Sequence, residues 1–169
     1  MQVKVINLSK NDLPRYETKN AAGLDVRADL SRITPTNPIK LYGDGEVIYA
    51  GESHPKAMVR IDVGSRVLVP TGLKVAIPEG YELKVRPRSG LALKKGITVL
   101  NTPGCVDSDF RGEIGVILIN HGTESFWFED GERIAQFTLE KVEQVEWEEV
   151  EELDSTERDS NGFGTTGLK

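Results

Sequence analysis

The chain has 169 residues, of which 38% are hydrophobic and 28% charged, and its formal net charge is -6. This length suits one domain with a buried core, and the composition is typical of neither a disordered chain nor a membrane protein. No apolar run approaches the roughly 20 residues of a transmembrane helix, and this charge balance lacks the basic surface that nucleic-acid binding favours. We therefore expect neither a membrane nor a nucleic-acid partner.

The negative charge is concentrated from Glu140 to Glu157, where Lys141 is the only basic residue. Such a run is typical of a solvated strand edge and linker.

Cysteine and histidine usage points to a reducing compartment without a zinc site. Cys105 is the only cysteine, which excludes an internal disulfide. His54 and His121 lie too far apart in the sequence for zinc-ligand spacing. The first residues do not resemble a signal peptide, so we expect a cytoplasmic protein.

Turn-forming residues predict an all-β fold. Seventeen glycines and eight prolines interrupt the chain too often for long helices, and short β-branched runs recur between them. Apolar residues alternate along several runs, and Pro78-Glu79-Gly80 is expected to close a hairpin between two of them. The predicted strands are Val3 to Asn7, Arg66 to Pro70, Gly72 to Ile77, Tyr81 to Val85, Ile97 to Leu100, Ile114 to Asn120, Ser125 to Phe128, Ile134 to Glu140 and Val142 to Val150.

The segment from Ser31 to Ser65 is rich in proline and glycine around a weak apolar stretch, Val47-Ile48-Tyr49. A loop of this length without structure would be unusual, so we expect an added hairpin or an ordered arm. A structural or subunit-contact role is favoured over a catalytic one.

One helix is predicted, from Ser89 to Lys95, with Ser89 as a possible N-cap and Gly96 as the stop. Its first N-H groups and positive dipole end would lie beside Arg88, which together could bind an anion.

The stretch from Asn101 to Glu113 combines turn residues, charge and an aromatic side chain. Thr102-Pro103-Gly104 is a turn signal, and apolar runs precede and follow the stretch, which predicts two strands joined by an exposed polar excursion.

Within this excursion, Asp107 or Asp109 could accept a proton, Phe110 could pack on a flat ligand and Arg111 could pair with an acid. The alternative is a tight turn whose acids bond only their own backbone.

This stretch resembles the third motif of the trimeric dUTPase family, roughly Gly-x-Ile-Asp-x-Asp-Tyr-Arg-Gly-Glu. Four further stretches match the other family motifs in the family's order: Ala22 to Ala28, Pro87 to Ala92, Gly131 to Gln136, and Arg158 to Gly167. Each match alone would be weak, but five ordered matches over nearly the whole chain make the resemblance specific.

The resemblance implies a jelly-roll-like β-barrel domain over residues 1–157, with the insertion near 31–65, and a flexible nucleotide-closing tail over 158–169. It also implies a homotrimer with sites shared between subunits. The implied reaction is hydrolysis of dUTP to dUMP and pyrophosphate, which limits uracil incorporation into DNA and supplies dUMP for dTTP synthesis.

By the same resemblance, Asp107 is the general base that activates water for attack on the α-phosphorus. The phosphates would be contacted by Arg88, Ser89 and Gly90. Mg2+ would be held mainly by phosphate oxygens, with Asp25 and Gln136 acting on it through waters, since Mg2+ dehydrates reluctantly.

Uracil would be read by Asn101 and by the backbone of Cys105 and Val106, leaving no room for a methyl or amino group. Phe110 replaces the usual tyrosine, so its ring can lie against deoxyribose but lacks the hydroxyl. Gly115 takes a site-lining position where relatives often carry a longer side chain.

Composition alone would make the C-terminal segment a flexible terminus. The resemblance implies that it folds over the nucleotide, with Phe163 stacked on uracil and the other contacts near the γ-phosphate. These closing residues are Arg158, Phe163, Gly164, Thr165 and Thr166. Asp159 and Asn161 stand where many relatives have glycine.

Two other functions are compatible with parts of the sequence. A dCTP deaminase shares the fold, but its catalytic glutamate would fall at Ile117, three residues before Asn120, and the stretch Arg88-Ser89-Gly90-Leu91 lacks the second serine of the deaminase. The second alternative is a trimeric nucleotide-binding or signalling protein without turnover. The intact third and fifth motifs disfavour this alternative.

Overall fold

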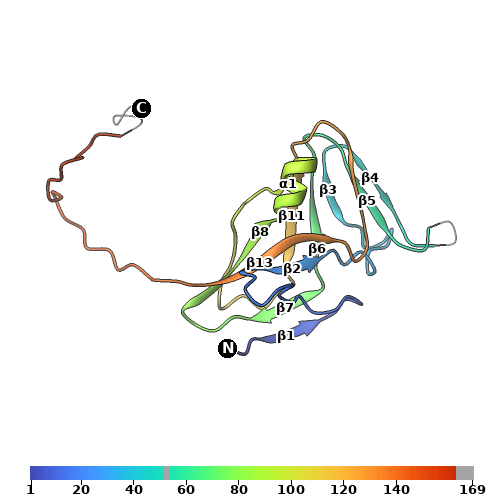
Figure 1. Cartoon of the computed structure of the whole chain (residues 1–169), viewed down its shortest axis with the longest axis horizontal. Helices are drawn as coiled ribbons and strands as arrows, with labels where there is room; N and C mark the ends of the chain where they lie inside the picture. Colours follow the sequence, from blue (N-terminus) through green and yellow to red (C-terminus); the bar gives the residue numbers. More distant parts are fainter. Residues whose placement is uncertain (52–53, 163–169) are drawn as a thin grey trace.

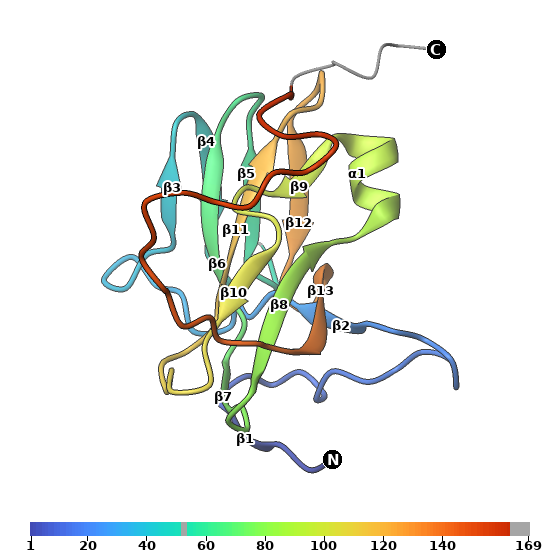
Figure 2. The same ribbon diagram turned by 90° about the vertical axis from the view of Figure 1, so that its left-hand side faces the viewer.

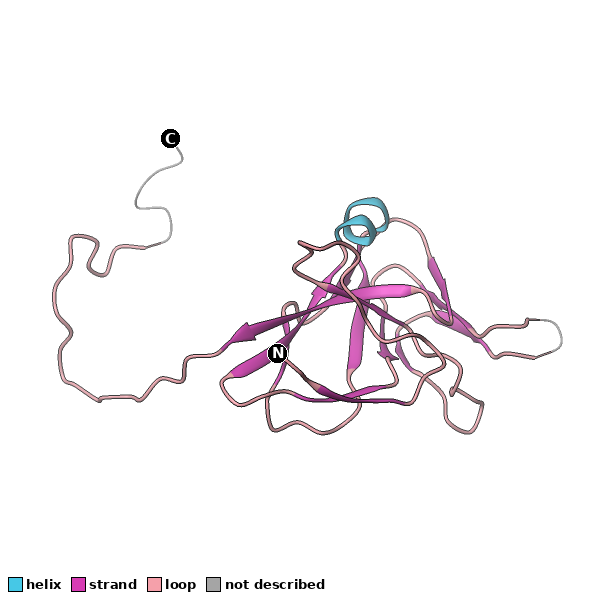
Figure 3. Cartoon of the chain, turned by 60° about the horizontal axis from the view of Figure 1, so that its bottom comes forward, coloured by secondary structure: helices cyan, strands magenta, loops and turns pink. Residues whose placement is uncertain are grey.

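The computed structural model describes residues 1–51 and 54–162, and it confirms the all-β expectation (Figure 3). The only helix in these ranges is α1 (Ser89–Lys95). None of the described helical structure is long and apolar enough to cross a membrane. The strands are β1 (Lys4–Asn7), β2 (Leu24–Arg27), β3 (Lys40–Tyr42), β4 (Gly45–Ile48), β5 (Met58–Ile61), β6 (Arg66–Pro70), β7 (Leu73–Ala76), β8 (Tyr81–Pro87), β9 (Ile97–Val99), β10 (Gly104–Val106), β11 (Gly115–Asn120), β12 (Phe126–Glu129) and β13 (Arg133–Lys141).

The described strands form four sheets, with strand orders β1-β7, β10-β8-β13-β2, β3-β6-β11-β9 and β12-β5-β4. They stay in separate ladders and do not close into one hydrogen-bonded barrel. The two four-stranded sheets contribute to a single cluster of buried side chains, including Val26 and Phe137 from one and Val67 and Val116 from the other. Burial of this apolar surface is the main force that holds the layers together.

Strand β8 lies inside its sheet, where it pairs with β10 on one edge and β13 on the other. Leu83 and Val85 are buried, whereas Glu82, Lys84 and Arg86 alternate with them on the opposite face of the strand. Figure 2 shows β10 beside β8, with α1 following the far end of β8.

The stretch from Asn101 to Glu113 joins β9 and β11, which pair antiparallel as predicted. The excursion between them also contains β10, a strand that the sequence did not reveal and that pairs with β8 in the other large sheet. The predicted turn begins it, with a cis Thr102–Pro103 peptide bond. The excursion is therefore fixed to both large sheets.

The segment from Ser31 to Ser65 contains the expected added hairpin. Strands β4 and β5 pair antiparallel, and β5 also pairs with β12. Strand β3 joins the edge of the β6-β11-β9 sheet.

The predicted strand from Val142 to Val150 is wrong. Strand β13 ends at Lys141, and the described residues beyond it leave the body of the molecule without joining a sheet (Figure 1). The alternation of acidic and apolar residues suits a strand, but a strand also needs a partner for its backbone groups. Residues 142–161 are exposed, with Trp147 at 89%, as expected for a solvated acidic linker. We call residues 142–162 the arm.

Candidate active site

The first part of the site forms where β8 runs into α1. Arg88 is the N-cap residue of α1, with an extended backbone (φ -86, ψ 126), and Ser89 is the first helical residue. Ser89 is therefore not the N-cap, because the helix begins one residue earlier than the capping pattern suggested. Gly96 ends the helix in the left-handed conformation (φ 67), as predicted.

A carboxylate held by two guanidinium groups defines this region. Asp25, only 8% exposed, accepts hydrogen bonds from Arg88 Nε at 3.3 Å and Arg133 Nη1 at 3.0 Å. Gln136 Nε2 donates to the same carboxylate at 3.0 Å. We call these four side chains the phosphate cluster, after the phosphate-binding role that the sequence predicts for Arg88.

The phosphate cluster brings together three motifs that are far apart in the sequence. The register explains it, because Gln136 on β13 lies opposite both Asp25 on β2 and Arg86 on β8. Arg133, for which the sequence predicts no role, completes the cluster. Its place inside the fourth motif, beside Gln136, was the signal that could have identified it.

The phosphate cluster does not form a metal-binding site by itself. Both oxygens of Asp25 already accept from guanidinium or amide groups. Across residues 1–51 and 54–162, no three His, Cys, Asp or Glu side chains gather closely enough to hold a metal ion. A divalent ion here would need oxygen ligands from elsewhere, such as phosphates and waters.

The second part of the site is the excursion from Asn101 to Glu113, which we call the hairpin. Asp107 follows β10, is exposed, and lines an open cavity of about 650 Å³ with Glu82, Cys105 and Arg111 among other residues. Its backbone carbonyl accepts from Phe110 N at 3.2 Å. In the described part of the chain, its carboxylate accepts only from the Cys105 thiol, at 3.6 Å. The turn is therefore tight, yet the carboxylate stays available.

The residues after Asp107 fold back on the hairpin itself. Arg111 Nη1 donates to the carbonyls of Ser108 at 2.6 Å and Phe110 at 2.8 Å, so it shapes the loop and pairs with no acid among the described residues. The Phe110 ring lies over Gly112, where a Cβ would come within 2.5 Å of the ring. Phe110 is still 43% exposed, which leaves apolar surface for a ligand.

Cys105 is held between two carboxylates. Its thiol donates to Glu82 Oε2 at 2.8 Å. This hydrogen bond, partial burial and the charges of Glu82 and Asp107 raise the pKa of Cys105 to about 12. The thiol therefore stays protonated at neutral pH. Glu82 was missed in the sequence because its contact depends on the register of the short strand β10.

We expect Cys105 to react slowly with iodoacetamide in the folded chain. With its pKa raised to about 12, the thiolate fraction at neutral pH should be far below that of the unfolded chain. Alkylation should be at least about a hundredfold slower than in urea, and Glu82→Gln should accelerate it. Mass spectrometry of timed reactions measures both rates. Equal rates in folded and unfolded wild type would contradict the assigned hydrogen bond.

The remaining predicted residues are spread over the fold. Ser89 lines a cavity of about 460 Å³ with Thr102 and Pro103, and Gly90 lines another of about 980 Å³ with Arg88.

Asn101 is exposed at the start of the hairpin, Val106 is half-buried on β10, and Gly115 lies opposite Pro70 on β11. A Cβ on Gly115 would come within 2.6 Å of Leu68.

Arg158 is in the arm and donates to the Asn161 carbonyl at 3.0 Å. Asp159 has a φ of 45, a conformation that favours the glycine found in many relatives. The predicted contacts of Phe163, Gly164, Thr165 and Thr166 lie outside the described residues.

The phosphate cluster and Asp107 do not meet within one chain. Val106 pairs with Leu83, so Asp107 lies level with Glu82, six residues before Arg88 on β8. At about 3.3 Å per residue, this places them about 20 Å apart. A single phosphate group cannot contact both.

Comparison with known proteins decides the family. A family model described as dUTPase matches residues 53–167. The chain belongs to the dUTPase family. It is 52% identical to the deoxyuridine 5'-triphosphate nucleotidohydrolase of Fusobacterium nucleatum, over 99% of this chain and 97% of that one. It is 41% identical to that of Finegoldia magna, over 99% of both chains.

Solved dUTPases share the fold at low sequence identity. The dUTPase of Staphylococcus bacteriophage 80alpha, solved with dUPNHPP, has a TM-score of 0.75 at 23% identity, over 99% of both chains. A variant dUTPase from phage phi11 of S. aureus, described with a structural Mg(II) ion, has a TM-score of 0.69 at 18% identity, over 92% of this chain and all of that one (100%).

Proposed function

We propose that this dUTPase-family chain hydrolyses dUTP to dUMP and pyrophosphate, with Asp107 as the general base. The Asp107 carboxylate takes a proton from water, the water oxygen bonds to the α-phosphorus, and the bond to the oxygen bridging the α- and β-phosphates breaks. The exposed carboxylate on a fixed turn carries this proposal, since a general base must be free to reach its water.

The phosphate cluster would bind the triphosphate. Arg88 and Arg133 carry the positive charge that phosphate groups require, and Asp25 holds both in place while it accepts a hydrogen bond from Gln136. Ser89 and Gly90 follow Arg88 at the start of α1, where backbone N-H groups lack helical partners. Ser89 would approach the oxygen that bridges the first two phosphates.

The chemistry of these residues suits Mg2+ held by the substrate. Because both Asp25 oxygens have protein partners, Asp25 and Gln136 would act on the ion only through waters. When bound, Mg2+ neutralises phosphate charge and aligns the phosphates for attack.

Strand β10 would read the base. It pairs with β8 on one edge only, so the backbone groups of Cys105 and Val106 on the other edge can bind uracil beside Asn101. The Phe110 ring would lie against deoxyribose. Readout by backbone explains why a cysteine is acceptable at this position.

A homotrimer would unite the two parts of the site. Asp107 would come from one chain, Arg88 and Gln136 from a neighbour, and the closing tail from another chain. The separation of about 20 Å between Asp107 and the phosphate cluster along β8 supports this arrangement. The arm could reach a neighbour, since its 16 residues before Arg158 would span up to roughly 50 Å when extended.

Hydrolysis by such a trimer would remove dUTP before DNA synthesis and provide dUMP for dTTP synthesis. Both roles follow from the chemistry of substrate and product.

The test is pyrophosphate release from each deoxynucleoside triphosphate in turn, with ammonia release from dCTP measured alongside. We expect rapid pyrophosphate release from dUTP alone and no ammonia, because the position of the deaminase glutamate is Ile117. Ammonia from dCTP would favour the deaminase, and binding without release of either product would favour a non-catalytic nucleotide-binding protein.

A further inference from the structure

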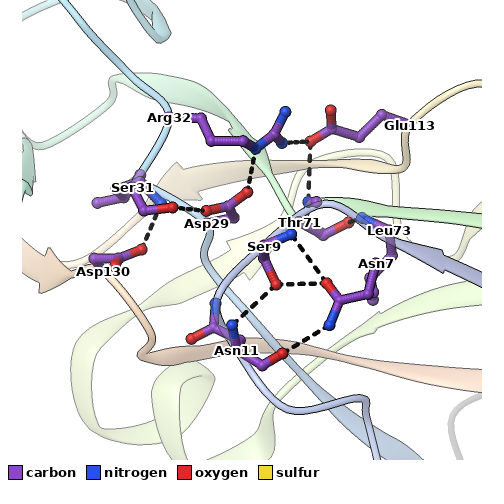
Figure 4. A network of polar contacts seen from close by, with 12 residues as sticks. Asn7, Ser9, Asn11, Asp29, Ser31, Arg32, Thr71, Leu73, Glu113 and Asp130 are labelled. Carbon is purple, nitrogen blue, oxygen red and sulfur yellow. Dashed lines mark hydrogen bonds and ion pairs between the residues drawn. The ribbon is translucent and has the colours of Figure 1, made fainter.

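The end of the hairpin is fastened by a network of ion pairs that the proposed reaction does not use (Figure 4). Glu113 Oε1 accepts from Arg32 Nη2 at 2.5 Å and from the backbone N-H of Gly72 at 2.9 Å. Arg32 Nε also donates to Asp29 Oδ2 at 2.6 Å. Arg32 thus bridges two carboxylates, one of which ends the hairpin.

The Asp29 end of this bridge is buried and fixed. Asp29 is completely buried (0% exposed), and its other oxygen accepts from Ser31 Oγ at 2.7 Å. A buried carboxylate is costly unless it is paired and hydrogen-bonded, so Asp29 strongly favours one position for Arg32. This packing also requires glycine at position 72, because a Cβ there would come within 2.7 Å of Asp29 Oδ2.

The backbone next to Glu113 is fixed as well. Thr71 Oγ1 donates to the Ile114 carbonyl at 2.7 Å, and Ile114 N donates to the Leu73 carbonyl at 2.9 Å. The hairpin therefore has two attachment points, which are β10 at its first half and the residues around Glu113 at its end.

Contacts inside the hairpin connect Gly112, the residue before Glu113, with Asp107. The Phe110 ring covers Gly112, and Arg111 binds the carbonyls of Ser108 and Phe110. Phe110 N in turn donates to the Asp107 carbonyl at 3.2 Å. Residues 107–113 behave as one compact unit, and movement at Glu113 would be passed to Asp107.

We propose that Arg32 and Glu113 are positioning residues, which hold the hairpin so that the Asp107 carboxylate meets the α-phosphate at the correct angle. This inference rests on the proposed function. It separates two tasks of the hairpin. Pairing with β8 keeps the uracil-reading backbone of β10 in place, whereas the Arg32–Glu113 pair sets the direction of the Asp107 carboxylate.

The principal variant is Glu113→Gln, which keeps the side-chain length and an acceptor for Gly72 N-H but loses the ion pair with Arg32. We expect kcat to fall by about 10- to 100-fold, because small displacements of a catalytic group have effects of this size. Affinity for a non-hydrolysable dUTP analogue should stay within about threefold, because β10 is untouched. Hydrogen exchange of the backbone amides in residues 107–113 should become about tenfold faster.

Arg32→Met completes the test as the other half of a double-mutant cycle. Since both substitutions break the same pair, the double variant should lose little more kcat than the worse single variant. Arg32→Lys should restore part of the activity. If Arg32→Met unfolds because Asp29 loses its counter-charge, Glu113→Gln alone still decides the question.

Arg60→Met is the matched control, because Arg60 pairs with Glu46 at 3.1 Å and Asp62 at 2.9 Å on the added hairpin. It should lower the thermal midpoint but leave kcat and the exchange of residues 107–113 unchanged. An equal loss of kcat in Arg60→Met and Glu113→Gln would overturn the positioning role. The positioning role would also be overturned if the backbone amides of residues 107–113 in Glu113→Gln exchanged hydrogen at the wild-type rate. If the wild type does not hydrolyse dUTP, the proposed function fails, while hydrogen exchange still tests whether the Arg32–Glu113 pair holds the hairpin.

Discussion

Asp107→Asn should lose turnover by on the order of 10² to 10⁴, the usual effect of removing a general base. The amide keeps the shape of the side chain but cannot accept a proton from water. Nucleotide affinity should stay near that of the wild type, because other residues are proposed to bind uracil and the phosphates. Steady-state kinetics and titration with a non-hydrolysable dUTP analogue measure the two quantities.

Asp109→Asn is the matched control for this variant. Asp109 is exposed on the same turn and lines the same cavity of about 650 Å³ as Asp107, but no role in proton transfer is assigned to it. An Asp107→Asn enzyme with unchanged kcat, or equal losses in both variants, would reject Asp107 as the base.

The second large effect is expected when two inactive chains are mixed. Chains ending at Glu157 lack the closing tail and should remain folded, because the exposed arm contributes nothing to the core. They should be nearly inactive, as should Asp107→Asn chains. Refolding equal amounts of both together should restore activity, although neither parent has it.

The size of the recovery follows from the shared site. A site works only when the truncated chain donates Asp107 and the Asp107→Asn chain donates the tail, so random closed rings give about one half times one half, or about a quarter of sites. If base and tail came from the same chain, no mixed site would contain both. Turnover no higher than that of the parents, with subunit exchange confirmed by light scattering of differently sized chains, would exclude sharing. Unfolding of the truncated parent would instead make the tail structural.

Much of the site was recognisable from local sequence because its residues lie in ordered motifs. Asp25, Arg88 and Gln136 were assigned to phosphate and metal binding, and the structure places them in contact. The sequence could not show that Asp107 lies apart from them. That separation depends on the register between β8 and β10, which no local pattern contains.

The misses have separate physical causes. The Arg32–Glu113 pair spans 81 positions, and charge patterning along the chain predicts only neighbours on one element. Ser89 fits the N-cap pattern, but the helix begins one residue earlier, after Arg88, without a side-chain capping hydrogen bond, so the capping pattern did not locate its start. The alternation from Val142 to Val150 describes a segment able to form a strand, and pairing depends on a partner that local sequence does not supply.

Strand β8 sets the distance between Arg88, which follows its last residue, and Asp107, which lies level with Glu82 near its start. In the proposed trimer, Arg88 and Asp107 face different neighbours, so the length of this strand sets the dimensions of the assembly. Two added residues would preserve the alternation of faces but shift Arg88 by about 7 Å relative to Asp107. All three sites would then lose alignment together. The β4–β5 hairpin lies in another sheet, so a longer loop there would leave this spacing unchanged.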